Sequence, residues 1–284
     1  MRVRAFGSTG SRVSVIGQGT WRIDAADRRE AIATLRAGID AGMTHIDTAE
    51  MYGEAEAIVG EAIVGEATAG LREEVFLVSK VVPGNASRRG VARACEQSLR
   101  RLNTDRLDCY LLHWPGQHPL EETIAGFEDL RRDGKILTWG LSNFDVDDLE
   151  RALRIAGPYR IACNQVLYHL GERAIEHAVM PWCARNGVAL VGYSPFGSGD
   201  FPDPNSAGGA LLARIAQAHG TTAYGVALAF LTRFENTFTL PKTVRPDRAV
   251  ANADAGDLVL SDAEITAIDA EFPRGPRPRM LPML

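Results

Sequence analysis

Residues 44–53 read THIDTAEMYG, and the organisation of the whole chain can be worked out from this stretch. Its first four residues are typical of a short buried strand that ends at Asp47, and Gly53 closes a turn. The next residues, 54–63, read EAEAIVGEAI and have the apolar spacing of an amphipathic helix. The stretch therefore predicts a strand, a turn and a helix, with Asp47 and Tyr52 placed where the strand ends.

The same alternation recurs along the chain. Strand-like apolar runs are expected at 13–19, 44–47, 75–80, 107–113, 136–143, 160–166, 188–194 and 237–243. Each leads to a helix-like stretch, and strands that are apolar on both faces are typical of a parallel sheet covered by helices. Eight such units in roughly 250 residues predict a closed (β/α)8 TIM barrel that forms a single domain over 1–284. An open doubly wound α/β sheet is the alternative.

Three segments fall outside the repeat, one at each end of the chain and one within it. The first residues predict a hairpin around Gly7 and Gly10 that plugs the floor of the barrel. The region 197–209 reads GSGDFPDPNSAGG and predicts a long loop that closes over a ligand. Residues 260–272 predict an additional C-terminal helix that begins with a capping box, and the Pro/Arg-rich tail after it predicts irregular structure.

Composition excludes several classes of protein. With 45% apolar and 24% charged residues the chain has enough apolar material for a core, and its net charge of −5 argues against a nucleic-acid-binding protein. It contains no apolar run of about 18 residues, so we expect no membrane span. The N-terminal residues do not resemble a signal peptide. The cysteines, at 95, 109, 163 and 183, form no CxxC pair, so we expect reduced thiols in a soluble cytoplasmic protein and take a monomer as the default.

Three polar residues end consecutive predicted strands. Asp47, Lys80 and His113 follow one another at intervals of 33 residues, about the length of one strand, loop and helix. This spacing predicts that all three lie at the same height on the carboxyl rim of the barrel, where active sites of such barrels lie. His45 shares a strand face with Asp47, and we interpret it as a hydrogen-bonded core histidine.

These rim residues suit proton transfer to an oxygen atom. A lysine ammonium beside Tyr52 favours the phenolate and lowers the pKa of the phenol towards the operating pH, which suits a general acid. A buried Lys80 would tend to lose its proton, and pairing with Asp47 would keep it charged. His113 could donate to a carbonyl oxygen or orient it. We therefore predict a proton-donating oxyanion site with no evident nucleophile.

The remaining strand ends indicate a nucleotide cofactor. Ser142, Asn143 and Gln165 offer the neutral groups that suit a carboxamide, and the ring of Tyr193 could stack on an aromatic ring. Two cations and a hydroxyl at the start of a helix suit a phosphate group. These are Lys242, Thr243 and Arg248. No complete G-x-G-x-x-G fingerprint occurs, so we expect the nucleotide to be held across a barrel rim.

Taken together, these residues resemble the aldo-keto reductase family over nearly the whole chain. The resemblance is carried by the motifs GQGTW, DTAEMYG, LVSK, LLHW, GLSNF, NQV, GYSPF and PKT, with Arg248 and Asn252. The segments AGMTHIDTAEMYG, SLRRLNTDRLD, LLHWPG and NQVLYHLG look most like the bacterial branch that includes methylglyoxal and general aldehyde reductases.

The resemblance implies a specific set of functional residues. Asp47, Tyr52, Lys80 and His113 would be the catalytic tetrad, with Tyr52 protonating the oxygen of an aldehyde or ketone while NADPH delivers a hydride. The NADPH site would comprise Thr20, Trp21, Asp47, Ser142, Asn143, Gln165, Tyr193, Ser194, Pro195, Phe196, Lys242, Thr243, Val244, Arg248 and Asn252. The substrate, a small carbonyl compound such as methylglyoxal, would contact Trp21, Tyr52, His113 and Trp114. No metal is implied.

Some details depart from the family pattern. Ala251 stands where many members have an acidic residue before the adenine-binding Asn252, and Thr243 stands where serine is common. Arg245 adds a cation that could strengthen the preference for a phosphate. The short tail after 272 predicts an open, permissive substrate pocket.

Two other functions compete with this interpretation. In a metal-dependent barrel hydrolase, His45, Asp47, Lys80 and His113 would serve as ligands. Strands five to eight, however, end in Ser, Asn, Gln, Tyr and Lys, which disfavours a metal site. The other is a redox-sensing barrel that binds the cofactor with little turnover, and the intact tetrad argues against it.

Overall fold

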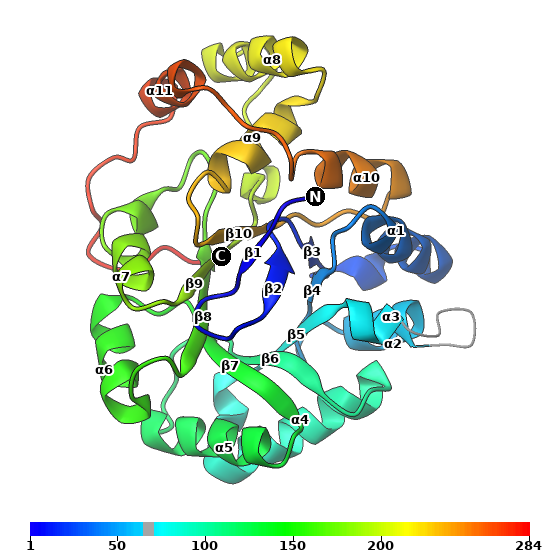
Figure 1. Cartoon of the computed structure of the whole chain (residues 1–284), viewed down its shortest axis with the longest axis vertical. Coiled ribbons are helices and arrows are strands. Elements are labelled where there is room, and N and C mark those ends of the chain that lie inside the picture. Colours follow the sequence, from blue (N-terminus) through cyan, green and yellow to red (C-terminus); the bar gives the residue numbers. More distant parts are fainter. Residues whose placement is uncertain (65–70) are drawn as a thin grey trace.

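Eight parallel strands form a barrel surrounded by helices in the computed structural model, which describes residues 1–64 and 71–284 (Figure 1). The strands are β3 (Gln18–Gly19), β4 (His45–Asp47), β5 (Phe76–Val81), β6 (Leu107–Leu112), β7 (Ile136–Ser142), β8 (Ile161–Leu167), β9 (Ala189–Tyr193) and β10 (Thr237–Leu240). Hydrogen bonds from Gly17 N to Thr239 O (2.8 Å) and from Thr239 N to Val15 O (3.0 Å) join the first strand to the last. The predicted (β/α)8 barrel is confirmed.

Helices connect and cover the strands. They are α1 (Arg28–Asp40), α2 (Ala55–Ile63), α3 (Leu71–Glu74), α4 (Arg88–Leu102), α5 (Leu120–Arg132), α6 (Val146–Ala156), α7 (Val179–Arg185), α8 (Ala207–His219), α9 (Ala223–Leu231), α10 (Pro246–Asp254) and α11 (Asp262–Glu271). The capping box predicted at the start of α11 is present, because Ser261 and Glu264 each accept a hydrogen bond from the other's backbone N–H. Such caps satisfy backbone donors that the first turn of a helix leaves free.

A hairpin closes the amino end of the barrel. Strands β1 (Val3–Ala5) and β2 (Arg12–Ser14) pair antiparallel, and the turn between them carries the fully buried Phe6. The ring of Phe6 lies 4.8 Å from that of Phe76 and 5.1 Å from that of Phe238, both near the beginnings of their strands. A Cβ atom on Gly7, whose φ is 56°, would lie 2.5 Å from the carbonyl oxygen of Ala162. The predicted plug is therefore confirmed, and glycine allows the turn to approach the barrel closely.

Some predicted boundaries differ from the structure. The run 13–19 is divided, because its first residues belong to the hairpin strand β2 and only Gln18 and Gly19 form the barrel strand β3. The helix-like stretch that follows the run 160–166 is also divided, into the 3-10 turn η4 (Ala174–Glu176) and the short α7. The long loop ends early, since the Ser206 hydroxyl caps α8 by accepting from Gly209 N and the helix begins at Ala207. The hydrophobic pattern alone does not reveal where one helix or strand ends and the next begins, because buried residues continue across these boundaries.

The structure also bears on the predictions of reduced cysteines and of no membrane-spanning segment. The four cysteines are free and buried. No helix within 1–64 and 71–284 has both the length and the apolar character needed to cross a bilayer.

Candidate active site

A cavity of about 420 Å³ opens at the carboxyl ends of the strands. It is lined by Gly19, Thr20, Trp21, Arg22, Asp47, Met51, Tyr52, His113, Trp114, Ser142, Asn143, Gln165, Tyr193, Ser194, Pro195, Phe196, Ser198, Leu240, Lys242 and Leu284. All of them except Leu284, which ends the C-terminal tail, come from the strands near their carboxyl ends or from the loops that follow them, as the barrel architecture requires.

A buried ion pair forms the base of the cavity. The Lys80 side chain is fully buried, and its ammonium group contacts Asp47 Oδ1 and donates to the carbonyl oxygen of Thr48 at 2.8 Å. The other carboxylate oxygen of Asp47 accepts a hydrogen bond from Gln165 Nε2 at 2.8 Å. Both charges are thus compensated by charged or polar partners, which buried ions require.

The strand spacing brings Asp47, Lys80 and His113 to the same rim, but they are not direct partners in the sheet. The backbone register pairs Asp47 with Val78 and Lys80 with Leu111, so each polar residue stands two positions beyond the partner of the preceding one. Strands of a closed barrel tilt against its axis, so positions at one height are offset along the strands.

Tyr52 and His113 face each other in the cavity. The Tyr52 hydroxyl lies 3.2 Å from His113 Nε2, and the two rings meet edge to face with centroids 5.5 Å apart. The ammonium nitrogen of Lys80 lies 5.1 Å from the centre of the Tyr52 ring. The phenol is therefore flanked by an imidazole and by a cation that is itself held by Asp47.

The charge states of this group follow from burial and from the lysine. Burial raises the pKa of Tyr52, and the Lys80 ammonium, which lowers it, does not fully offset this effect. The expected net lowering of the Tyr52 pKa was therefore wrong, because removing the phenolate from water raises the pKa more than the Lys80 ammonium lowers it. Burial lowers the pKa of Lys80, but Asp47 and Tyr52 outweigh it, and the net pKa is raised. The lysine is thus charged, as predicted.

His113 and His45 are both neutral. Burial and the nearby Lys80 ammonium lower the pKa of each to about 3. His45 lies among aromatic rings at the barrel floor, with its centroid 5.6 Å from that of Phe76. Neither ring nitrogen of His45 has a hydrogen-bond partner among the described residues. The core position of His45 is confirmed, but the prediction that its ring is hydrogen-bonded was wrong, because its neighbours are apolar.

Neutral polar groups line another part of the cavity. Asn143 Nδ2 donates to the carbonyl oxygen of His113 at 3.1 Å, and the Tyr193 hydroxyl donates to Asn143 Oδ1 at 3.0 Å. Asn143 and Ser194, which directly follow β7 and β9, have φ angles of 62° and 52°. Positive φ is uncommon outside glycine and is found where surrounding structure holds the chain in a defined shape. The amide and the phenol are thus fixed in place before any ligand binds.

The start of α10 carries exposed charged groups. Lys242 lines the cavity, and burial together with Arg22 lowers its pKa, while Asp24 opposes that change. Arg245 was expected to supply a further free cation, but its guanidinium pairs with Asp247 at 2.7 Å. The Thr243 hydroxyl accepts a hydrogen bond from Arg245 N at 3.1 Å. The added cation at this position is therefore paired with a carboxylate in the first turn of α10.

Most residues predicted for the site line one cavity, and a few do not. Lys80 lies beneath the surface of the cavity, with no exposed area. The residues beyond its edge are Thr243, Val244, Arg248 and Asn252, all in the segment that contains α10. Residues that line the cavity but were not predicted are Gly19, Arg22, Met51, Ser198, Leu240 and Leu284. Arg22 and Met51 adjoin predicted residues in the chain, whereas no local signal points to Leu284.

The described residues contain no cluster of three or more His, Cys, Asp or Glu that could hold a metal ion. The geometry supports acid catalysis instead. A phenol beside an ammonium can give a proton to an oxyanion, because the ammonium stabilises the phenolate that remains. A neutral imidazole within hydrogen-bond distance of that phenol can contact the same oxygen atom.

Comparison with known proteins identifies the family. The model of the Aldo/keto reductase family matches residues 15–271. The chain is 44% identical to the methylglyoxal reductase YeaE of Escherichia coli, over 91% of this chain and 90% of that protein. It is 34% identical to the glyoxal reductase of Bacillus subtilis, over 89% and 87% of the two chains. The crystal structure of an aldo/keto reductase from Klebsiella pneumoniae in complex with NADP and acetate superposes with a TM-score of 0.90, at 41% identity and 99% coverage of both chains. The chain therefore belongs to the aldo/keto reductase family.

Proposed function

We propose that this chain is an NADP(H)-dependent reductase of small aldehydes and ketones, methylglyoxal among them, with Tyr52 as the proton donor. The observation that carries the proposal is the position of the Tyr52 hydroxyl, 3.2 Å from His113 Nε2 and above the buried Lys80–Asp47 pair. The solved relative with NADP bound supports the choice of cofactor.

The residues of the cavity fit a nicotinamide nucleotide. A volume of about 420 Å³ falls within the range of roughly 300–1,000 Å³ common for ligand sites. Ser142, Asn143 and Gln165 would hold the carboxamide, and the Tyr193 ring would lie against the nicotinamide. Because burial lowers the pKa of Lys242, an arriving phosphate would restore a favourable partner for its charge. Thr243 and Arg248 would complete the 2′-phosphate site, and Asn252 would contact the adenine.

The chain's own residues supply the proton. Bound NADPH supplies a hydride to the carbonyl carbon. Tyr52 then gives its hydroxyl proton to the carbonyl oxygen, and the raised pKa means that the phenol starts out protonated. The Lys80 ammonium stabilises the phenolate, and Asp47 keeps that lysine charged despite its burial. His113, neutral because of its lowered pKa, orients the oxygen without competing as an acid.

The walls of the cavity support small carbonyl substrates. Trp21, Met51 and Trp114 line it next to Tyr52 and provide apolar surface around the reacting oxygen. Two relatives are named for the reduction of methylglyoxal and glyoxal, compounds of two or three carbon atoms. We further propose that the protein acts as a monomer in the cytoplasm, where free buried cysteines are common.

A panel of aldehydes assayed with NADPH and with NADH tests the proposed function. We expect turnover of methylglyoxal and other small aldehydes, with kcat/KM higher for NADPH than for NADH. Tight binding of NADPH without turnover of any aldehyde would support the redox-sensing alternative. Equal efficiency with both nucleotides would remove the 2′-phosphate site from the proposal.

A further inference from the structure

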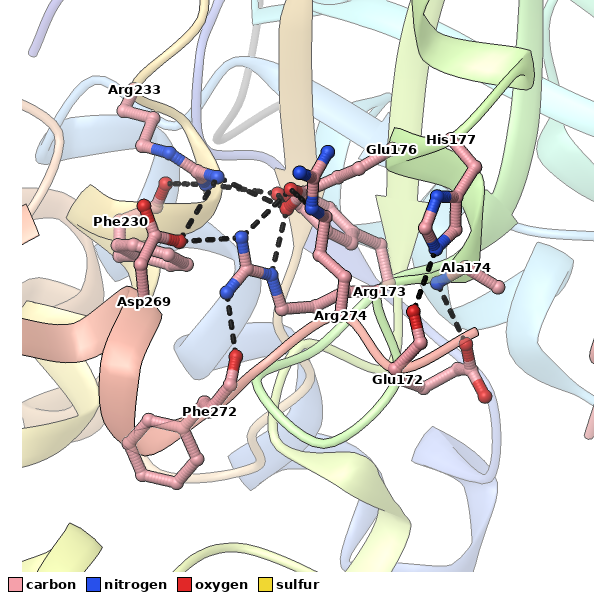
Figure 2. Close-up of polar contacts among 12 residues, drawn as sticks. Glu172, Arg173, Ala174, Glu176, His177, Phe230, Arg233, Asp269, Phe272 and Arg274 are labelled. Atoms are coloured by element: carbon pink, nitrogen blue, oxygen red, sulfur yellow. Dashed lines mark hydrogen bonds and ion pairs between the residues drawn. The ribbon is translucent and has the colours of Figure 1, made fainter. Parts of the chain in front are cut away.

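A second group of charged side chains lies outside the cavity, where η4, the end of α9 and the end of α11 meet (Figure 2). At its centre, Glu176 accepts hydrogen bonds from the Tyr168 hydroxyl at 2.6 Å, from Arg173 Nε at 2.9 Å and from Arg233 Nη2 at 3.0 Å. Arg173 also donates to Asp269 Oδ1 at 2.6 Å. We refer to Arg173, Glu176, Arg233 and Asp269 as the ionic cluster.

The centre of the ionic cluster is buried, whereas Asp269 at its edge is 45% exposed, and its charged groups pair with one another. The side chains of Arg173 and Glu176 are 3% and 5% exposed. The two guanidinium groups of the cluster also lie over the ring of Phe230, at 4.9 Å for Arg173 and 3.8 Å for Arg233. Because its carboxylates and guanidiniums already pair with each other, the cluster is built to join segments of the chain rather than to receive a ligand.

One of the joined segments is the tail that follows α11. Arg173 Nη1 donates to the carbonyl oxygen of Phe272 at 2.6 Å, and His177 Nε2 lies 3.0 Å from the carbonyl oxygen of Gly275. The Arg274 guanidinium lies 3.9 Å from Glu176. In Figure 2 the contacts of Arg173, Arg233 and Arg274 meet at the Glu176 carboxylate, and Arg173 also reaches the backbone at Phe272. Side chains around η4 thus hold the first residues of a tail that has no helix or strand of its own.

The same tail contributes to the wall of the cavity. Beyond the ionic cluster, Arg277 lies 3.8 Å from Asp145, and Leu281 packs against the hydrophobic core. In Figure 1 the tail leaves α11, passes α7 and ends near the middle of the barrel. Leu284 lines the cavity together with Tyr52, Trp114 and Tyr193. The path of the tail therefore connects Arg173 with the substrate side of the site.

We propose that Arg173 is a positioning residue that acts through the tail and sets which aldehydes the cavity accepts. Anchored by Arg173, the tail keeps Leu284 against the cavity, which narrows it and favours small aldehydes. When the contact between Arg173 and the tail is lost, the tail moves away from the cavity. Bulky aldehydes then gain access, while Tyr52, Lys80 and His113 keep their positions. This inference rests on the proposed reductase function for its substrate effect, whereas the anchoring itself does not.

The test compares Arg173→Gln with wild type in the full-length chain. The measured ratio is kcat/KM for 4-nitrobenzaldehyde divided by kcat/KM for methylglyoxal. We expect the ratio to rise about fivefold to tenfold, mainly through KM, as the loss of one apolar wall contact would produce. The dissociation constant for NADPH should not change. Arg173→Lys, which keeps the charge, should restore part of the wild-type ratio.

Hydrogen–deuterium exchange provides a readout that does not depend on turnover. Exchange over residues 273–284 should rise in Arg173→Gln. It should stay at the wild-type level in the control Arg88→Gln, which breaks the Arg88–Asp129 ion pair between α4 and α5. If wild type reduces no aldehyde, the proposed function fails, but the exchange result still decides whether Arg173 anchors the tail.

Two further variants complete the test. Leu284→Ala should raise the same ratio, and combining it with Arg173→Gln should add little, because both changes act through one wall. Should Arg173→Gln not fold, His177→Ala removes only the contact with Gly275 and should shift exchange and ratio in the same direction by a smaller amount. Unchanged exchange in the anchoring variants, or faster exchange with an unchanged ratio, would overturn the inference.

Discussion

The two ends of the cavity are built differently. At the ends of β4–β6, Lys80 and Asp47 are buried, and each charged or polar group contacts another within the group. At the start of α10, by contrast, Lys242 and Arg248 are exposed. The only ion pair recorded there among the described residues joins Arg245 to its neighbour Asp247.

This difference matches the two functions that we propose for these ends, proton transfer and binding of the cofactor phosphate. A proton transfer gains most from charges that are fixed in advance in a water-poor site, since electrostatic interactions are stronger there and need no reorganisation. Binding of a phosphate instead needs cations that can reach the ligand and replace their bound water with it. Exposed cations suit this function, because keeping them charged carries little desolvation cost. We therefore expect substitutions at the buried end to affect the chemical step and the fold, and those at the exposed end to affect cofactor affinity.

Lys80→Met should have the largest effect. It removes the cation that stabilises the phenolate and leaves Asp47 buried without its partner. We expect kcat to fall by roughly 10²–10⁴-fold. The free energy of unfolding should drop by about 3–5 kcal/mol, the usual cost of an uncompensated buried charge. Steady-state kinetics and urea unfolding measure the two effects, and near-normal values for both would show that the pair is dispensable.

Acidification should destabilise the protein through its buried histidines. His45 and His113 have pKa values of about 3 in the folded state, whereas an unfolded histidine has a pKa near 6.5. The unfolded state therefore binds more protons below pH 6.5, and stability falls as the pH falls. Between pH 7 and pH 5 each residue should cost about 2 kcal/mol.

His45→Leu isolates one of these contributions. The variant should show a shallower loss of unfolding free energy between pH 7 and pH 5 than wild type, because one site of proton uptake is gone. The control is Val259→Ala, which changes an exposed apolar side chain, removes no titratable group and should leave the slope unaltered. A slope in His45→Leu equal to that of wild type would contradict the assignment of His45 as neutral in the folded state.

Lys242→Ala tests the exposed end. We expect KM for NADPH to rise about tenfold or more, as loss of a charge-assisted hydrogen bond would cause. KM for NADH should change little, because NADH lacks the 2′-phosphate. The kcat should stay within about twofold, since Lys242 takes no part in the proton transfer proposed for Tyr52, Lys80 and His113. Equal increases for both nucleotides would place Lys242 elsewhere on the cofactor.

The smallest effect is expected for Arg245→Ala. Its guanidinium is already paired with Asp247, so its removal takes away little net positive charge from the site. Exposed ion pairs of this kind contribute little to stability as well. KM for NADPH should therefore change by less than about twofold, which makes this variant a matched control for Lys242→Ala. A tenfold increase would show that Arg245 leaves Asp247 to bind the cofactor.

Features that depend on where the strands end could be predicted from the sequence. The repeated strand and helix pattern indicated the barrel, and the spacing of Asp47, Lys80 and His113 predicted that they share one rim. Such features depend on local periodicity and on one rule about where strands of a barrel end.

Other features depend on contacts between distant parts of the chain. The net pKa of Tyr52 required the extent of its burial, and the apolar surroundings of His45 required Phe6 and Phe76 to meet at the barrel floor. The place of Leu284 in the cavity could not be predicted, because the path of an irregular tail depends on side chains of another segment, such as Arg173, which donates to Phe272 O. No local pattern contains that information.

The Tyr52→Phe variant tests the central claim most directly, because it removes one oxygen atom from the cavity and keeps the ring. Reduction of methylglyoxal by this variant should fall at least about a hundredfold, while the dissociation constant for NADPH measured by fluorescence stays at the wild-type value. A variant that binds NADPH normally and reduces methylglyoxal at the wild-type rate would show that another group donates the proton.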